Sequence, residues 1–161
     1  MSNSIKSQSN LSGLLENISD VFFRYIIYPE YKLDYISPSV FELTGYTQEE
    51  FYANPFLAYN TLHSEDSEIK KKSEEAIKNN KVQEKGVVVG NIELRTIKKD
   101  GTVIWTETIS KVVKNDAGII TSVEGVARDI TARKKLELEA KSVAENYSRR
   151  EGIRSRRRRS S

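Results

Sequence analysis

The side chains that most often perform chemistry in proteins are scarce in this sequence. Among its 161 residues there is one histidine, His63, and no cysteine. Without cysteine the chain cannot form a disulfide, a thiolate metal site, a cysteine nucleophile or a covalent cysteine adduct. A single histidine with no supporting motif gives neither a Ser-His-Asp arrangement nor a multi-histidine metal site. We therefore expect no catalytic residue and no metal site, and we interpret His63 as a structural loop residue.

A glycine at each end of the segment 86–90 (Gly-Val-Val-Val-Gly) does not make it a phosphate-binding loop. The segment lacks the lysine of such loops and the strand-to-helix context in which they lie. We expect a flexible entry to the next strand instead. With no nucleotide loop and no catalytic set, the sequence predicts that this chain is not an enzyme.

The strongest charge feature is an arginine-rich C-terminus. The net charge is +3, but residues 149–161 hold seven Arg and one Glu, or +6, so residues 1–148 hold −3. The folded part is therefore mildly acidic, and the basic character of the chain does not indicate a nucleic-acid-binding domain. For the tail, three interpretations stay open: a disordered solvated segment, residues foreign to the natural protein, or a segment that binds nucleic acid or acidic lipid.

Sequence patterns predict both helices and strands. Residues 1–10 are polar and are expected to be disordered, with no signal peptide, so the expected location is cytoplasmic. Ser37 before Pro38, and the capping-box pair Thr47 and Glu50, each predict the start of a short helix. A longer helix is expected over residues 64–80. Strands are expected at residues 21–28, 32–36, 91–98, 102–114 and 119–130, and the turns Asp100-Gly101 and Asn115-Asp116-Ala117-Gly118 separate the last three. This order predicts an α+β fold with helices on one face of an antiparallel sheet.

Apolar residues at helical spacing flank this domain at both ends. In the N-terminal helix expected over residues 11–19 they are Leu11, Leu14, Leu15 and Ile18. In the linker helix expected over residues 132–148, a coiled-coil ladder is formed by Leu136, Ala140, Val143 and Tyr147. The next ladder position is Arg150, where the apolar seam ends. We expect a homodimer that uses both helices.

Residues from about 11 to 138 resemble a PAS domain with its C-terminal PAC segment, of the kind found in bacterial and archaeal sensor histidine kinases and diguanylate cyclases, and we place the domain itself at residues 11–131. The segments that carry the resemblance are Tyr35-Ile36-Ser37-Pro38-Ser39, Leu43-Thr44-Gly45-Tyr46-Thr47-Gln48-Glu49-Glu50-Phe51, Leu62-His63-Ser64-Glu65-Asp66, Lys99-Asp100-Gly101-Thr102-Val103-Ile104-Trp105 and Gly125-Val126-Ala127-Arg128-Asp129-Ile130-Thr131. The resemblance implies a five-stranded antiparallel sheet in the order 2-1-5-4-3. It also implies a sensory domain that regulates an attached or partner effector, such as a histidine kinase or a cyclic-dinucleotide enzyme. The alternatives are a ligand-free dimerisation module and, less favoured, a nucleic-acid binder that uses the basic tail.

The resemblance also suggests where a ligand and a signal would act. Aromatic residues that either line a central cavity or simply fill the core are Phe41, Tyr46, Phe56, Tyr59 and Trp105. Haem is disfavoured because the helix expected at 64–80 has no histidine, and a covalent flavin adduct is excluded by the absence of cysteine. The cofactor is otherwise unassigned. Asp129, Ile130 and Thr131 are expected to couple the sheet to the output helix, with Thr131 as its N-cap and Asp129 paired with Arg95 or Arg128.

Overall fold

The computed structural model describes residues 19–78 and 90–159. Four residues expected to take part in dimerisation, Leu11, Leu14, Leu15 and Ile18, lie outside the described residues, as does the N-terminal segment 1–10. The chain divides into two compact units, residues 1–129 and residues 130–161.

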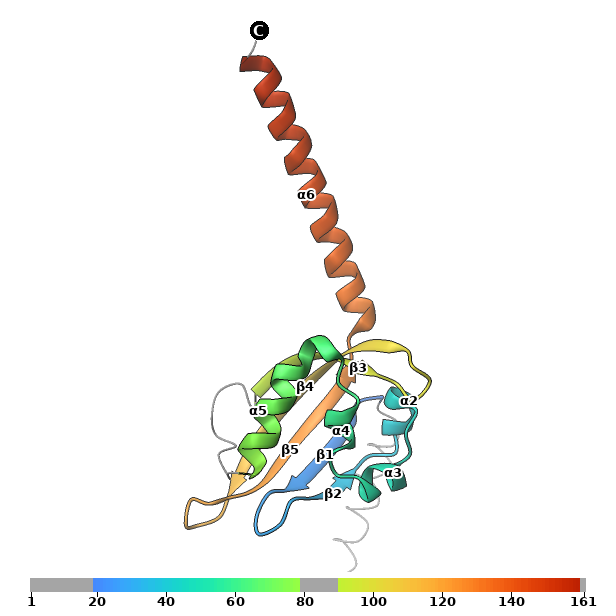
Figure 1. Cartoon of the computed structure of the whole chain (residues 1–161), viewed down its shortest axis with the longest axis vertical. Coiled ribbons are helices and arrows are strands. Elements are labelled where there is room, and N and C mark those ends of the chain that lie inside the picture. The colour runs from blue at the N-terminus through green and yellow to red at the C-terminus, as the bar shows by residue number, and fades with distance from the viewer. Residues whose placement is uncertain (1–18, 79–89, 160–161) are drawn as a thin grey trace, which may run out of the picture. The chain divides into compact units, whose positions relative to one another are not determined.

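Five strands of the first unit form one antiparallel sheet (Figure 1). They are β1 (Val21–Ile26), β2 (Lys32–Ile36), β3 (Gly90–Ile97), β4 (Val103–Lys114) and β5 (Ile120–Asp129). Their spatial order is β2-β1-β5-β4-β3, which confirms the order expected from the sequence. The first and last strands therefore pair inside the sheet, where Val21 lies opposite Ala127 and Ile26 lies opposite Ser122.

Tight turns join the last three strands where the sequence predicted them. In the first turn, Asp100 Oδ1 accepts a hydrogen bond of 2.9 Å from the Thr102 N–H. In the second, Asn115 Oδ1 accepts backbone hydrogen bonds of 3.0 Å. Gly101 and Gly118 have φ angles of +88° and +76°, which glycine adopts at no steric cost. Both hairpin predictions are confirmed.

Short helices lie over one face of the sheet and connect β2 to β3 (Figure 1). They are α2 (Val40–Thr44), α3 (Gln48–Ala53), α4 (Leu57–Asn60), the 3-10 helix η1 (Ser64–Asp66) and α5 (Ser67–Lys78). The predicted capping box is present at α3: the Thr47 hydroxyl accepts from the Glu50 N–H, and the Glu50 carboxylate accepts from the Thr47 N–H.

Ser37 does not cap a helix, although its position before Pro38 predicted this role. Helix α2 begins at Val40, and its cap residue Ser39 makes no side-chain capping bond. Ser37 is fully buried, and its Oγ accepts a hydrogen bond of 2.9 Å from the Phe22 N–H. The prediction failed because a backbone N–H shielded from water needs an acceptor, and Ser37 supplies one to β1.

The hydrophobic core of the first unit lies between the helices and the sheet. Successive side chains of a strand point to opposite faces, so Val21 and Tyr25 of β1 are buried while Arg24 between them is exposed. Helices α2 and α3 contribute Val40 and Phe51, which are 1% and 2% exposed.

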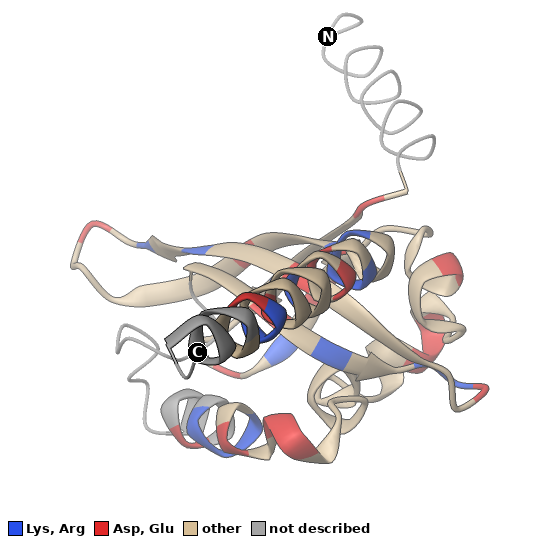
Figure 2. Cartoon of the chain, turned by 90° about the horizontal axis from the view of Figure 1, so that it is seen from above, with Lys and Arg blue, Asp and Glu red and all other residues tan. Residues whose placement is uncertain are grey.

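The second unit contains α6 (Thr131–Arg159), a helix longer than predicted. The sequence placed a linker helix at residues 132–148 and a disordered tail at 149–161, whereas the helix continues through Arg159. Arginine is among the better helix formers and no proline interrupts this segment, so the arginine run does not end the helix. Charges of both signs occur along α6 (Figure 2), and Arg133 and Lys134 each lie 3.6 Å from a Glu137 carboxylate oxygen.

Candidate functional site

A cavity of about 140 Å³ lies within the first unit, between the helices and the sheet. Its size matters because an engineered apolar cavity of about 150 Å³ in another protein stays dry and binds benzene. Strand β1, the helices and the last three strands all contribute to its wall. The lining residues are Val21, Phe23, Tyr25, Ile27, Tyr31, Ile36, Val40, Leu43, Thr44, Phe51, Ala58, Tyr59, Thr61, Leu62, Ile69, Ile92, Leu94, Thr96, Thr106, Thr108, Val123 and Ala127.

The wall of the cavity contains no Asp, Glu, Lys, Arg or His among the described residues. Most of its threonine hydroxyls are already engaged by the protein. Thr44 Oγ1 donates to the Val40 carbonyl at 2.8 Å, and Thr61 Oγ1 donates to the Ala58 carbonyl at 2.9 Å. Thr96 and Thr106 bond to each other through their hydroxyls at 2.9 Å. These threonines therefore behave as part of an apolar wall.

Tyrosines from separate segments gather on the cavity wall. Tyr31, in the β1–β2 connection, stacks on Tyr25 of β1 with ring centroids 5.5 Å apart and an interplanar angle of 7°. The Tyr31 hydroxyl donates to the Pro55 carbonyl at 3.5 Å. Desolvation by burial raises the pKa of both Tyr25 and Tyr31 above the usual tyrosine value, so both hydroxyls stay protonated at neutral pH.

The Tyr25 hydroxyl is buried and has no hydrogen-bond partner within the described part of the chain. Leaving a buried polar group unpaired costs about 1–3 kcal/mol. No other buried side-chain nitrogen or oxygen of the described residues is left in this state. Tyr25, one of the lining residues, thus carries a buried hydroxyl that has no partner among the described residues, on a wall that is otherwise largely apolar.

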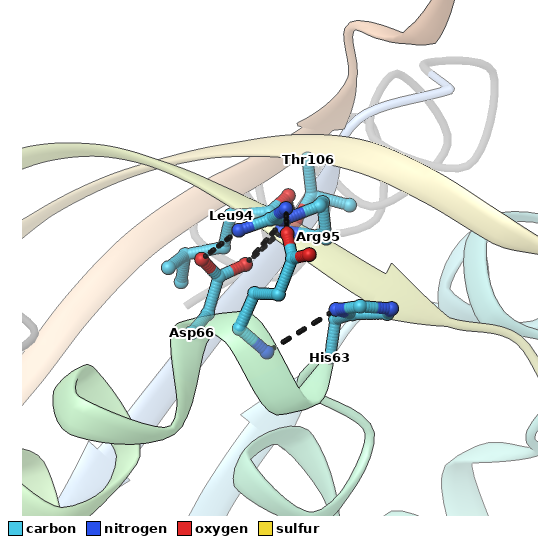
Figure 3. A network of polar contacts seen from close by, with 6 residues as sticks. His63, Asp66, Leu94, Arg95 and Thr106 are labelled. Carbon is cyan, nitrogen blue, oxygen red and sulfur yellow. Dashed lines mark hydrogen bonds and ion pairs between the residues drawn. The ribbon is translucent and has the colours of Figure 1, made fainter.

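An ion-pair cluster ties η1, which directly precedes α5, to β3 (Figure 3). Helix α5 and strand β3 carry Ile69 and Leu94 on the cavity wall. The Asp66 carboxylate accepts from the Arg95 backbone N–H at 2.8 Å and from its Nη2 at 2.8 Å. The Arg95 guanidinium also pairs with Glu65. These contacts fix the spacing between two sides of the cavity.

His63 stands at the start of η1 beside this cluster. The His63 ring Nδ1 accepts a hydrogen bond from the Glu65 N–H at 3.3 Å (Figure 3). The backbone N–H of His63 donates to the Arg95 carbonyl at 2.9 Å. These bonds agree with the structural role expected for His63. Among the described residues, no group of three or more His, Cys, Asp or Glu side chains could hold a metal ion.

Of the aromatic residues proposed to line a cavity, Tyr59 is in the wall. Phe56 is not among the lining residues, and its ring centroid lies 4.8 Å from that of Tyr31, which is. Tyr46 packs edge-on against Phe51 at 6.4 Å, outside the cavity. Phe41 is 57% exposed, so its assignment to the cavity was wrong, because it lies on the outer side of the short helix α2.

Trp105 is also absent from the cavity wall. Thr106 and Thr108 of β4 line the cavity, so Trp105 points to the opposite face of the sheet. There the Arg95 guanidinium lies 5.2 Å from the Trp105 ring centroid, a cation–π contact.

Sequence reasoning missed Tyr25 and Tyr31, the tyrosines that stack at the cavity wall. A signal was available for Tyr25, because period-2 alternation along β1 places it on the same face as Val21 and Phe23. Tyr31 had no such signal, since it lies in a connection whose path no periodicity specifies.

The junction residues join β5 to α6. Asp129 is the last residue of β5, and Thr131 is the first of α6. The Ile130 carbonyl accepts a hydrogen bond of 2.9 Å from the Lys134 N–H, so Ile130 occupies the cap position expected for Thr131. Arg95 and Arg128, the expected partners of Asp129, pair with Asp66 and Asp20 respectively.

The ladder residues of α6 are exposed. Leu136 and Val143 are 67% and 69% exposed, Tyr147 is 68% exposed, and Ala140 is also exposed. No described helix is long and apolar enough to cross a membrane. The expected cytoplasmic location stays a prediction.

The sequence model of the family described as "PAS fold" matches residues 33–127. The chain is also 26% identical over 138 residues to the methyl sulfide methyltransferase-associated sensor of Methanosarcina acetivorans. That alignment covers 83% of this chain but only 13% of the relative's length.

Solved structures share the fold. One is a sensory box histidine kinase/response regulator from Burkholderia thailandensis, with a TM-score of 0.62 and 18% identity, covering 86% of this chain and 98% of that one. Another is the N-terminal domain of a diguanylate cyclase with PAS/PAC sensor from Marinobacter aquaeolei, with a TM-score of 0.57 and 22% identity, covering 71% and 98% respectively. At these identities the likeness concerns the fold alone.

Proposed function

The chain belongs to the PAS fold family, and we propose that it is a sensory domain that regulates an effector through its C-terminal helix. The relative named as a sensor supports this role, although this chain spans only 13% of that protein. A histidine kinase or a cyclic-dinucleotide enzyme is the proposed effector class, because neighbours of the same fold come from proteins so named. The effector would follow α6 or act in trans, and this chain itself would not be an enzyme.

The proposal rests on the short backbone connection between β5, a strand of the cavity wall, and the output helix α6. Val123 and Ala127 of β5 line the cavity. The same strand ends at Asp129, and α6 starts at Thr131, so a single residue separates them. Because no flexible loop intervenes, a shift of β5 caused by a bound ligand would be passed along the backbone to α6.

A chimaera tests this role. Residues 1–148 replace the sensory domain of a histidine kinase, and one to seven residues are inserted after Tyr147. Since seven residues restore the face of a coiled-coil helix, we expect autophosphorylation to vary with insertion length and to return near the parent level at seven. The kinase without any sensory domain gives the baseline. Activity independent of insertion length would refute regulation through α6.

A ligand-free dimerisation module is the second candidate, favoured by the exposed apolar ladder of α6. Such a module would also form homodimers, but it would bind no small molecule in the cavity. Nucleic-acid binding by the arginine-rich tail stays a prediction from the sequence.

A further inference from the structure

We propose that the cavity binds a small, neutral, largely apolar molecule through one hydrogen bond to the Tyr25 hydroxyl. The inference rests on the proposed sensory role, for which it names the chemical class of the signal. Size, charge and hydrogen bonding at the cavity each narrow that class.

The volume sets the size of the ligand. A cavity of about 140 Å³ is close to the roughly 150 Å³ that accommodates benzene, which indicates a ligand of about six to nine non-hydrogen atoms. A haem or a flavin is several times larger, so the cavity as it stands does not fit either group.

The wall sets the charge of the ligand. None of its described residues is an Asp, Glu, Lys, Arg or His, and the raised pKa values of Tyr25 and Tyr31 keep both hydroxyls protonated at neutral pH. Transfer of an unpaired ion from water into such surroundings is strongly unfavourable. Carboxylates and phosphates are therefore excluded, whereas neutral phenols, alcohols, ketones or ethers fit.

The unpaired hydroxyl sets the polar group of the ligand. Thr44, Thr61 and Thr96 already use their hydroxyls within the protein, whereas Tyr25 Oη has no partner among the described residues. A ligand oxygen that accepts from Tyr25 would satisfy it. A purely apolar ligand would leave it unpaired and would bind more weakly.

Probes of matched size test the proposal. Phenol and toluene have the same number of non-hydrogen atoms, and benzoate adds a charge. Binding to the full chain is measured by calorimetry, and the methyl signals of Leu94, Val123 and Ala127 are followed by NMR. We expect phenol to bind roughly tenfold more tightly than toluene and benzoate to leave the cavity methyls unchanged.

Two variants separate the hydrogen bond from the cavity. Tyr25→Phe removes only an unpaired hydroxyl, so the chain should stay folded and bind phenol and toluene equally well. Leu94→Phe fills the cavity and leaves Tyr25 in place, so both probes should lose binding. Circular dichroism checks that each variant is folded.

Three outcomes overturn the proposal. The first is that no probe shifts the methyl signals of the cavity residues. The second is that the wild type binds phenol and toluene equally because a water satisfies Tyr25, and the third is that Tyr25→Phe leaves the preference for phenol intact.

Failure of this ligand proposal is distinguishable from failure of the proposed sensory role. If the probes fail while the chimaera still depends on insertion length, only the ligand class falls. If the probes bind while the chimaera is indifferent, the site stands and the regulatory role falls.

Discussion

The carboxylate of Asp66 accepts three hydrogen bonds from Arg95, one from the backbone N–H at 2.8 Å and two from the guanidinium at 3.2 and 2.8 Å. The Asp66 side chain is only 12% exposed and that of Arg95 is 24% exposed, so water screens this pair weakly. The pair holds η1 against β3 and therefore supports the cavity wall.

Asp66→Asn should lower the free energy of unfolding by about 1.5–3 kcal/mol, the usual contribution of a hydrogen bond to a charged group. Urea denaturation followed by tryptophan fluorescence measures it. Glu65→Gln is the matched control, because Glu65 pairs with the same guanidinium but its side chain is 64% exposed. Loss of the exposed Glu65–Arg95 ion pair should lower the free energy of unfolding by less than about 1 kcal/mol. Equal effects of the two substitutions would contradict the special role of Asp66.

Gly125→Ala should destabilise the sheet by about 1–3 kcal/mol, as overpacking does in other proteins. A Cβ at this position would lie 2.5 Å from Phe23 Cζ and 2.7 Å from the Ile109 carbonyl oxygen. In a Phe23→Leu background the loss should shrink but not vanish, because the carbonyl remains. Gly152→Ala in α6 is the control, because an added Cβ there would meet nothing within 4 Å beyond the adjacent residues and the helix's own backbone, and it should not lower the melting temperature. An unchanged stability of Gly125→Ala would show that β5 can move away from β1.

Local signals in the sequence predicted the elements of the sheet but not the shape of the cavity. The turns at Gly101 and Gly118 and the capping box at Thr47 each depend on a few adjacent residues, and all three are present. The strand order followed from the resemblance to a family, since no periodicity specifies which strands become neighbours.

The cavity could not be predicted because its wall combines distant segments. Phe41 and Trp105 have the right chemistry but point away from it, one from a helix of five residues and one from the opposite face of β4. Tyr25 and Tyr31 were missed because they stack on each other only once the β1–β2 connection folds back over β1, and no sequence pattern specifies the path of that connection. Helix α6 was predicted too short because the loss of apolar ladder residues ends a seam, not a helix.

Glu50→Gln should destabilise the domain in a pH-dependent way. The Lys99 ammonium, 2.6 Å from the Glu50 carboxylate, and the Thr47 N–H lower the pKa of Glu50. Because the folded-state pKa is depressed, the stabilisation is present above the usual glutamate pKa and is lost as the pH falls through the folded-state value. The difference in melting temperature between wild type and Glu50→Gln should therefore be largest near pH 7 and shrink on acidification below the usual pKa.

The control for this titration is Glu42→Gln, because the Glu42 carboxylate makes no hydrogen bond or ion pair with the described residues. The melting temperature of Glu42→Gln should differ little from that of wild type, and by a similar amount at every pH tested. A pH-independent effect of Glu50→Gln would show that the glutamine replaces the carboxylate in the capping box and that the ion pair with Lys99 contributes nothing.

Charged substitutions in the α6 ladder test the proposed homodimer. Leu136 and Val143 are exposed in the single chain, and a coiled coil would bury both. Placing Glu at either position would bury a charge, so we expect Leu136→Glu and Val143→Glu each to weaken dimerisation roughly tenfold or more in sedimentation equilibrium. Leu138→Glu is the matched control, since Leu138 is 61% exposed but lies outside the ladder. Equal weakening by all three substitutions, or a wild-type chain that stays monomeric at high concentration, would rule out this interface.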